Sequence, residues 1–166
     1  MSTQPEVWLR GPIDGIHALL QPVAHSVLQM REEVTALGSS LPEHILWTKP
    51  AGVASAGFHL KHIAGVLDRL STYAQGNALN DEQRAHLRAE SEAVEGETVQ
   101  SLVRDLHDRV DQFIELLRTF DEPQLTNARE VGRAKLPSTV LGLLFHAAEH
   151  SQRHLGQLLV TVRVQL

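Results

Sequence analysis

Cysteine is absent from this chain of 166 residues. Its absence excludes disulfide bonds, a thiolate nucleophile and zinc held by cysteine. A metal site, if the chain has one, must use histidine, carboxylate and water as ligands. A basic patch is lacking as well, because the 15 Lys and Arg residues are dispersed among 20 Asp and Glu residues and the net charge is −5. We therefore expect no nucleic-acid partner.

Long apolar runs are also missing. No run approaches the roughly 18 residues that predict a membrane span, and residues 1–6 lack the basic start and the apolar stretch of a signal peptide. We therefore expect a cytoplasmic protein with no membrane partner. The sequence also lacks a phosphate-binding loop, a dinucleotide fingerprint and a Ser-His-Asp arrangement, which removes the enzyme classes that these motifs mark.

The composition that remains is typical of a globular protein. Apolar residues make up 42% of the chain and charged residues 21%, which is the balance of a soluble folded protein rather than a disordered one. The length is that of one ordinary domain with a substantial core, so we expect a single domain spanning residues 1–166.

Apolar residues recur with helical spacing along almost the whole chain. We predict long amphipathic helices at 12–37, 55–74, 98–117 and 138–162, and a short polar helix at 81–91. Pro22 lies inside the first of these, so we expect a kink or a restart there. The segment 121–137 is expected to be a loop, since no strand pairs or hairpin turns stand out. The alternation of Val160, Val162 and Val164 with polar residues leaves a short extended tail open.

Four long amphipathic helices predict an all-α protein, namely a four-helix bundle. The connection between the second and third long helices is about twenty residues, long enough to cross the end of the bundle. The order of helix directions therefore stays open. Within this connection, the acidic residues at positions 90, 92, 95 and 97 are interpreted as a solvated linker.

Three histidines stand one helical turn apart near the C-terminus, at His146, His150 and His154. The chain has ten histidines. Random placement at that density gives roughly 0.6 pairs spaced by four residues but only about 0.03 such triplets. Imidazoles at positions i and i+4 project from one helix face and can share a metal ion. The triplet therefore indicates a function rather than scatter.

Helix geometry decides which of these histidines can share one ion. His150 and His154 are about 6 Å apart along the helix axis, whereas His146 and His154 are about 12 Å apart, which is too far for bonds of about 2 Å. A third ligand must come from another helix. His62 lies within the apolar stripe of the helix at 55–74, and His59 lies roughly 60° away from that stripe. We therefore predict His62, His150 and His154 as the ligands.

Three neutral imidazoles leave at least one coordination position open to water or substrate, which is the ligand set of a catalytic rather than a closed structural site. Imidazole also suits nickel, iron, manganese and copper. We expect a divalent ion, with zinc or nickel as the first candidates. A di-iron centre of the ferritin type is disfavoured, because no inward Glu and Glu-x-x-His pairs fall on the core stripes.

Two segments resemble the DinB/YfiT-like metalloenzymes. One is Phe58-His59-Leu60-Lys61-His62-Ile63-Ala64-Gly65-Val66, shortly after Trp47-x-x-Pro50. The other is His146-x3-His150-x3-His154-Leu155-Gly156-Gln157, which is similar to a final-helix motif that usually reads His-x3-His-Arg-Gly-Gln. The resemblance covers most of the chain in order and spacing, and its last motif is the most specific part.

The resemblance implies a four-helix bundle, a divalent metal on His62, His150 and His154, and a homodimer. It also implies a small-molecule substrate, since some relatives are S-transferases or isomerases that use low-molecular-weight thiols and others carry a hydrolase label. One departure is visible at Leu155, where the family often has Arg. Arg153 is about 100° away from His154 on the helix and is a poor replacement.

Four further residues are candidates for contact with a substrate or thiol. Arg69 lies about two turns beyond His62, where it could meet an anionic group. His59, His146 and Gln157 could line the pocket or hold the ligands in place. Glu149 precedes His150 and is about 100° from it, so it is a weak candidate for orienting a ligand and a weaker one for a general base.

Two classes of function follow. The first is a metal-dependent enzyme, either a thiol-dependent S-transferase or a small-molecule hydrolase. The second is a metal-binding or stress-response protein without catalysis, whose metal is vestigial or structural. A structural metal predicts that chelation lowers the melting temperature strongly. A catalytic metal on a pre-built bundle predicts that the metal-free protein stays folded.

Overall fold

The computed structural model describes residues 4–166. Over this range the chain forms five α-helices and two short strands. Their bounds are α1 (Gln21–Gly38), α2 (Ala56–Ala74), α3 (Asp81–Ala89), α4 (Val99–Leu117), β1 (Ala128–Val131), β2 (Leu136–Thr139) and α5 (Val140–Arg163). The protein is therefore mostly helical, as the periodicity predicts, with a small sheet that it does not predict.

The long helices begin at side chains that cap them. Ser55, Thr98 and Thr139 each accept a hydrogen bond from a backbone N–H in the first turn of α2, α4 and α5, which satisfies a donor that the helix itself leaves free. The predicted break at Pro22 is the start of α1. Proline is tolerated there because its missing N–H would be free in a first turn anyway. Residues 12–20, predicted as helix, form no α-helix.

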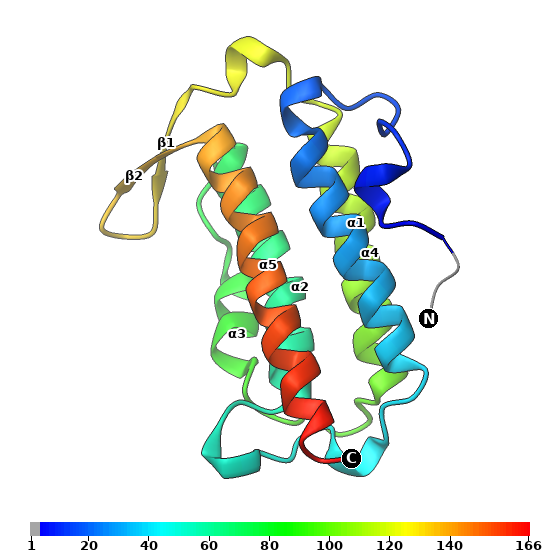
Figure 1. The fold of residues 1–166 in the computed structure, drawn as a ribbon. Helices are drawn as coiled ribbons and strands as arrows, with labels where there is room; N and C mark the ends of the chain where they lie inside the picture. The colour runs from blue at the N-terminus through cyan, green and yellow to red at the C-terminus, as the bar shows by residue number, and fades with distance from the viewer. Residues whose placement is uncertain (1–3) are drawn as a thin grey trace.

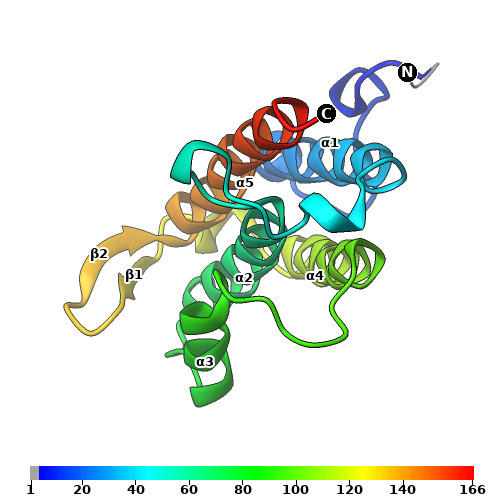
Figure 2. The same ribbon diagram turned by 90° about the horizontal axis from the view of Figure 1, so that it is seen from below.

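The four long helices lie around a shared apolar core, and Figure 2 shows the arrangement of these helices from below. α2 contacts α5 and α4, and α1 contacts the same two helices, so each long helix has two long neighbours. Each of the four long helices contributes fully buried side chains, among them Val27, Leu67, Leu106 and Leu144. Burial of apolar surface on this scale is the main stabilising contribution to such a fold.

The order of helix directions, left open by the sequence, is settled by the short helix α3. α2 and α4 run in the same direction, because α3 and the connection after it carry the chain back along α2 before α4 begins (Figure 1). α5 runs opposite to α2 and lies directly against it. The side chains of α2 and α5 therefore meet in reverse order along their common groove.

The segment 121–137 is not the simple loop that the sequence predicts. β1 and β2 pair antiparallel, with Val131 opposite Leu136, and the hairpin projects beside the start of α5 (Figure 1). The Arg129 Nε donates a hydrogen bond to the carbonyl of Ala74 at 2.8 Å, which fastens the hairpin to the end of α2. Four-residue strands of mostly exposed side chains are too short for their periodicity to register in a sequence.

The extended tail that the valine alternation left open is absent from residues 160–163, because α5 continues to Arg163. Val162 is buried in the core whereas Val160 and Val164 are exposed. One buried position among the three is sufficient to keep the last turn packed. Between residues 4 and 166, no helix combines the length and the apolar character needed to cross a lipid bilayer.

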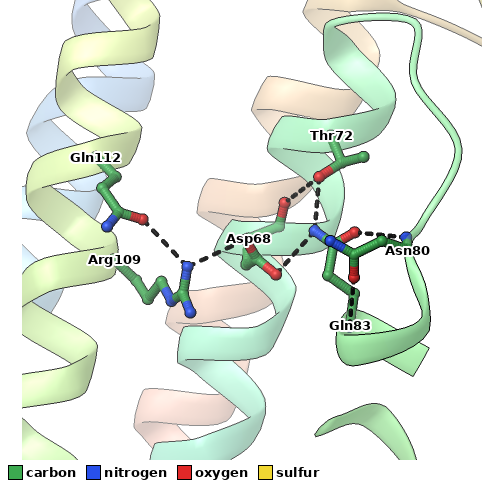
Figure 3. A network of polar contacts seen from close by, with 6 residues as sticks. All are labelled: Asp68, Thr72, Asn80, Gln83, Arg109 and Gln112. Atoms are coloured by element: carbon green, nitrogen blue, oxygen red, sulfur yellow. Dashed lines mark hydrogen bonds and ion pairs between the residues drawn. The ribbon is translucent and has the colours of Figure 1, made fainter. Parts of the chain in front are cut away.

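A polar network docks α3 on α2 and is drawn in Figure 3. The Gln83 side-chain amide donates to Asp68 at 2.9 Å and to Thr72 at 2.7 Å. Gln83 also closes a reciprocal cap with Asn80 at the start of α3. Asp68 in turn accepts from Arg109 of α4 at 3.2 Å. None of the α3 side chains is fully buried, so these polar contacts, rather than apolar burial, hold the helix in place.

We expect Gln83→Ala to release α3 while the four long helices remain folded, because the substitution removes the side-chain bonds to α2 and the Gln83 half of the reciprocal cap. Amide hydrogen exchange should become faster in Asp81–Ala89 and change little in α4. Gln112→Ala is the matched control, since Gln112 bonds only Arg109 within its own helix. Equal exchange in α3 of both variants would contradict this account of its docking.

Candidate metal centre

α2 and α5 bring four histidines together along their common groove, and a fifth, His146, lies at its solvent-exposed edge. α2 supplies His59 and His62, and α5 supplies His146, His150 and His154. Because the two helices are antiparallel, the later α2 residue meets the earlier α5 residue. His59 lies against His154, with their Nδ1 atoms 3.0 Å apart. His62 lies against His150, with their Nε2 atoms 3.0 Å apart.

The three histidines predicted as ligands lie close together. One ring nitrogen from each of His62, His150 and His154 lies within 4.8 Å of the others. The rings of His62 and His154 are 4.3 Å apart between centroids, and those of His150 and His154 are 4.6 Å apart. Metal–imidazole bonds of about 2 Å allow nitrogens at such separations to share one ion after small side-chain shifts. The donor set therefore fits a divalent cation.

His62 is held in one orientation by a buried carboxylate. Its Nδ1 donates to Glu90 Oε2 at 2.6 Å, and Glu90 Oε1 accepts from Arg69 at 2.6 Å. Glu90 is 5% exposed and Arg69 is 8% exposed. With the proton on Nδ1, the lone pair of Nε2 points toward His150. A carboxylate behind a ligand histidine fixes its tautomer and makes it a better ligand.

The interpretation of Glu90 as part of a solvated linker is wrong. Docking of α3 on α2 turns the residue that follows the helix inward, so Glu90 is buried while Glu92 and Glu95 remain exposed. Glu97 is also engaged, since it accepts from Lys61 at 2.9 Å. Four similar acidic residues in a connection contain no signal that separates these roles. Only the docked position of α3 shows that Glu90 is buried while Glu92 and Glu95 are exposed.

Gly65 makes room for this carboxylate on the surface of α2. A Cβ atom at Gly65 would lie 2.5 Å from Glu90 Oε1 and closer still to the Arg69 guanidinium. Any side chain there would push the ion pair away from the helix. Gly65, one turn after His62, therefore leaves the space in which Glu90 and Arg69 form their ion pair beside the histidine.

Burial keeps His59, His150 and His154 neutral. Removal from water lowers the pKa of His59 to about 4, with the neighbouring His62 acting in the same direction. The pKa of His154 is also lowered to about 4, by burial first and then by His62 and His150. Burial lowers the pKa of His150 as well. Neutral imidazole is the form that binds metal, so these ligands need not lose a proton near pH 7.

The other predicted site residues have distinct surroundings. His59 is 3% exposed and touches His154, so it lies behind the predicted ligands. Gln157 is exposed and, with His59, Arg153 and Val160, lines a depression of about 590 Å³. The Arg69 guanidinium faces the protein's own Glu90. Its predicted contact with an anionic substrate stays a prediction, as do the contacts of His59, His146 and Gln157.

His146 and Glu149 form a separate pair on the outer side of α5. The His146 Nδ1 donates to Glu149 Oε1 at 2.7 Å, and Arg153 bonds both Glu149 oxygens at 2.7 and 2.8 Å. One ligand atom from each of His146, Glu149 and His150 lies within 4.8 Å of the others. The hydrogen bonds of Glu149 go to His146 and Arg153, and its predicted role in orienting a ligand stays a prediction.

The family model of the DinB superfamily matches residues 27–158, which contain the four histidines of the groove and His146. The chain belongs to the DinB superfamily. Members of this superfamily commonly bind a divalent metal, and the histidine cluster is compatible with a metal-binding protein. No curated protein matches the chain.

The departure from the usual DinB motif has a local explanation. Leu155 stands where the resembling motif often has Arg, and it is buried in the core. In this chain the position faces the apolar interior, where a charged side chain without a partner would be costly. Arg153 points outward and pairs with Glu149, so it does not substitute for the motif arginine inside the groove.

We expect His150→Ala to abolish stoichiometric metal, because His150 is the predicted ligand that meets both His62 and His154. The measurement is elemental analysis of protein purified without a histidine tag. His25→Ala on α1 is the control, since His25 bonds only the Gly11 carbonyl. Full metal content in the His150 variant would exclude the predicted centre.

The Gly65→Ala variant tests whether the space at Gly65 is needed to hold Glu90 beside His62. Displacing Glu90 from His62 should weaken Zn²⁺ binding by about 10–100-fold, which is typical for loss of a partner behind a metal ligand. Gly156→Ala is the matched control, because a Cβ there meets nothing within 4 Å. Both changes favour helix by roughly 1 kcal/mol, so propensity cannot explain a difference. Equal Zn²⁺ affinities, measured by competition with a chromophoric chelator, would contradict the assigned role of Glu90.

Proposed function

We propose that this DinB superfamily protein is a metal-dependent enzyme acting on small molecules, with one divalent ion on His62, His150 and His154. The observation that carries the proposal is the convergence of these three imidazoles in one groove, with His62 already oriented by Glu90. The packing of α1, α2, α4 and α5 against one another supports the four-helix bundle that the sequence predicts.

Three protein ligands leave coordination positions for a reactant. When bound, a divalent ion at such a centre lowers the pKa of a thiol or a water molecule that it coordinates. The protein's own contribution is to position the ligands before the reactant arrives. Glu90 holds the Nδ1 proton of His62, and burial keeps His150 and His154 in the neutral form that binds.

Between the two reaction classes, we favour thiol-dependent S-transfer over hydrolysis. A thiol that coordinates a metal is deprotonated outright, whereas hydrolysis profits from a carboxylate or histidine free to take a proton from water. The two carboxylates beside the histidines are both engaged. Glu90 is bonded to His62 and Arg69, and Glu149 to His146 and Arg153. This engagement supports a nucleophile that needs no base from the protein.

The depression beside His59 supports a small organic substrate. Its lining combines apolar groups from Val53, Ala54 and Val160 with Arg153, whose guanidinium is bonded to Glu149. Small-molecule sites are typically concave, largely apolar and oriented by a few polar groups. An electrophile with an apolar body and an anionic end suits such a lining.

The experiment compares apo protein with protein loaded with Zn²⁺ or Ni²⁺. It measures conjugation of 1-chloro-2,4-dinitrobenzene to cysteine, glutathione, bacillithiol and mycothiol, and in parallel the hydrolysis of small esters and amides. We expect metal-dependent thiol conjugation that His62→Ala removes. Turnover that is equal with and without metal, or unchanged in the His62 variant, would contradict the proposal.

The alternative, a metal-binding protein without catalysis, is distinguished in the same preparations. It predicts metal binding without turnover of any of these substrates, and a structural metal further predicts a large fall in melting temperature on chelation. The four long helices share an extensive core of apolar side chains, whose packing does not depend on a metal. We therefore expect the apo protein to remain folded, with a melting temperature close to that of the loaded form.

A further inference from the structure

The second histidine cluster, on the outer side of α5, is not used by the proposed activity. It consists of His146, Glu149 and His150, whose ligand atoms lie within 4.8 Å of one another. The group contains two imidazoles and a carboxylate, which together suit divalent transition metals such as Zn²⁺, Co²⁺ and Ni²⁺. It shares His150 with the His62–His150–His154 centre, so the two groups adjoin along one helix.

The shared histidine has a ring nitrogen with no partner. His150 Nε2 lies against His62, but His150 Nδ1 is buried and makes no hydrogen bond within residues 4–166. A buried polar atom without a partner is rare and needs an explanation. His62 has Glu90 behind its ligand nitrogen, and His150 has no such carboxylate. A cation held by His150 Nδ1 at the outer group would satisfy this atom.

Exposure differs between the two groups. The His146 side chain is 48% exposed and that of Glu149 is 31% exposed, whereas that of His62 is 17% exposed. The outer group therefore meets solvent first. A neutral imidazole has one lone pair at a time, so His150 can serve the outer group through Nδ1 or the inner centre through Nε2, but not both.

We propose that His146, Glu149 and His150 form an outer site for a divalent transition-metal cation, from which His150 passes the ion to His62 and His154. His150 is a ligand before and after this transfer, through Nδ1 and then through Nε2, while the other two ligands are exchanged. The ion therefore leaves Nδ1 before it binds Nε2, and the imidazole proton moves from Nε2 to Nδ1 by exchange with water. The loading role rests on the inner centre proposed above; binding at the outer site does not.

Arg153 regulates access to the outer site. It bonds both oxygens of Glu149, and these are the atoms that a cation would need. The Arg153 side chain is 55% exposed, so it can swing into solvent when a cation arrives. Removal of the guanidinium should free the carboxylate and strengthen the outer site without touching the inner ligands.

The first test measures the rate of Co²⁺ loading by stopped-flow visible absorbance, without substrate. Glu149→Gln and His146→Ala should slow loading severalfold, and Arg153→Gln should accelerate it, while the equilibrium affinity of the inner centre stays the same. His146 and Arg153 are exposed and Glu149 is partly exposed, so we expect the fold to be retained. Identical loading rates in the wild type and the three variants would overturn the loading role.

The second test isolates the outer site in the double variant His62→Ala/His154→Ala, titrated calorimetrically with Co²⁺. We expect this double variant to bind one Co²⁺ ion weakly per chain. Adding Glu149→Gln should lower the Co²⁺ affinity by more than about tenfold, because even residues that only hydrogen-bond a metal ligand contribute that much to affinity. If adding Glu149→Gln leaves the Co²⁺ affinity unchanged, the outer site itself is overturned. Neither test measures turnover, so a failure of the proposed enzyme activity is distinguishable from a failure here.

Discussion

The buried contact among Arg69, Glu90 and His62 links the fold to the candidate metal centre. Removing a carboxylate and a guanidinium from water is costly, and the two groups are tolerated because each satisfies the other at 2.6 Å. Glu90 uses its second oxygen to hold His62. Removal of either charged partner would leave the other buried alone, at a typical cost of about 3–5 kcal/mol. Stability and ligand orientation thus depend on one carboxylate.

That contact exists only because three separate features coincide. The polar network around Gln83 and Asp68 fastens α3 to α2, and the chain then turns inward at Glu90. Gly65 leaves α2 without a side chain at the point of closest approach. An exposed, weakly packed helix therefore determines the position of a buried charge. The groove between α2 and α5 adds its own constraint, since burial keeps His59 and His154 neutral.

Much of this arrangement was predictable from local patterns. The apolar stripes place α2 and α4 within a residue of their observed bounds. The ligand candidates were predictable because helical geometry allows only neighbours at i and i+4 to share an ion, and because His62 lies on the inward face of α2. The hairpin β1–β2 was not predictable, since its two strands are short and mostly exposed.

The sequence by itself determined the helices, the histidine spacing and the absence of any cysteine ligand, because periodicity, capping and composition act over a few neighbouring residues. Only the tertiary structure decided that Glu90 is buried while Glu92 is exposed, that α2 and α4 run parallel, and that His59 lies against His154. These facts depend on where α3 docks and on how α2 meets α5. Such contacts join residues about 20 to 95 positions apart, and no local pattern records them.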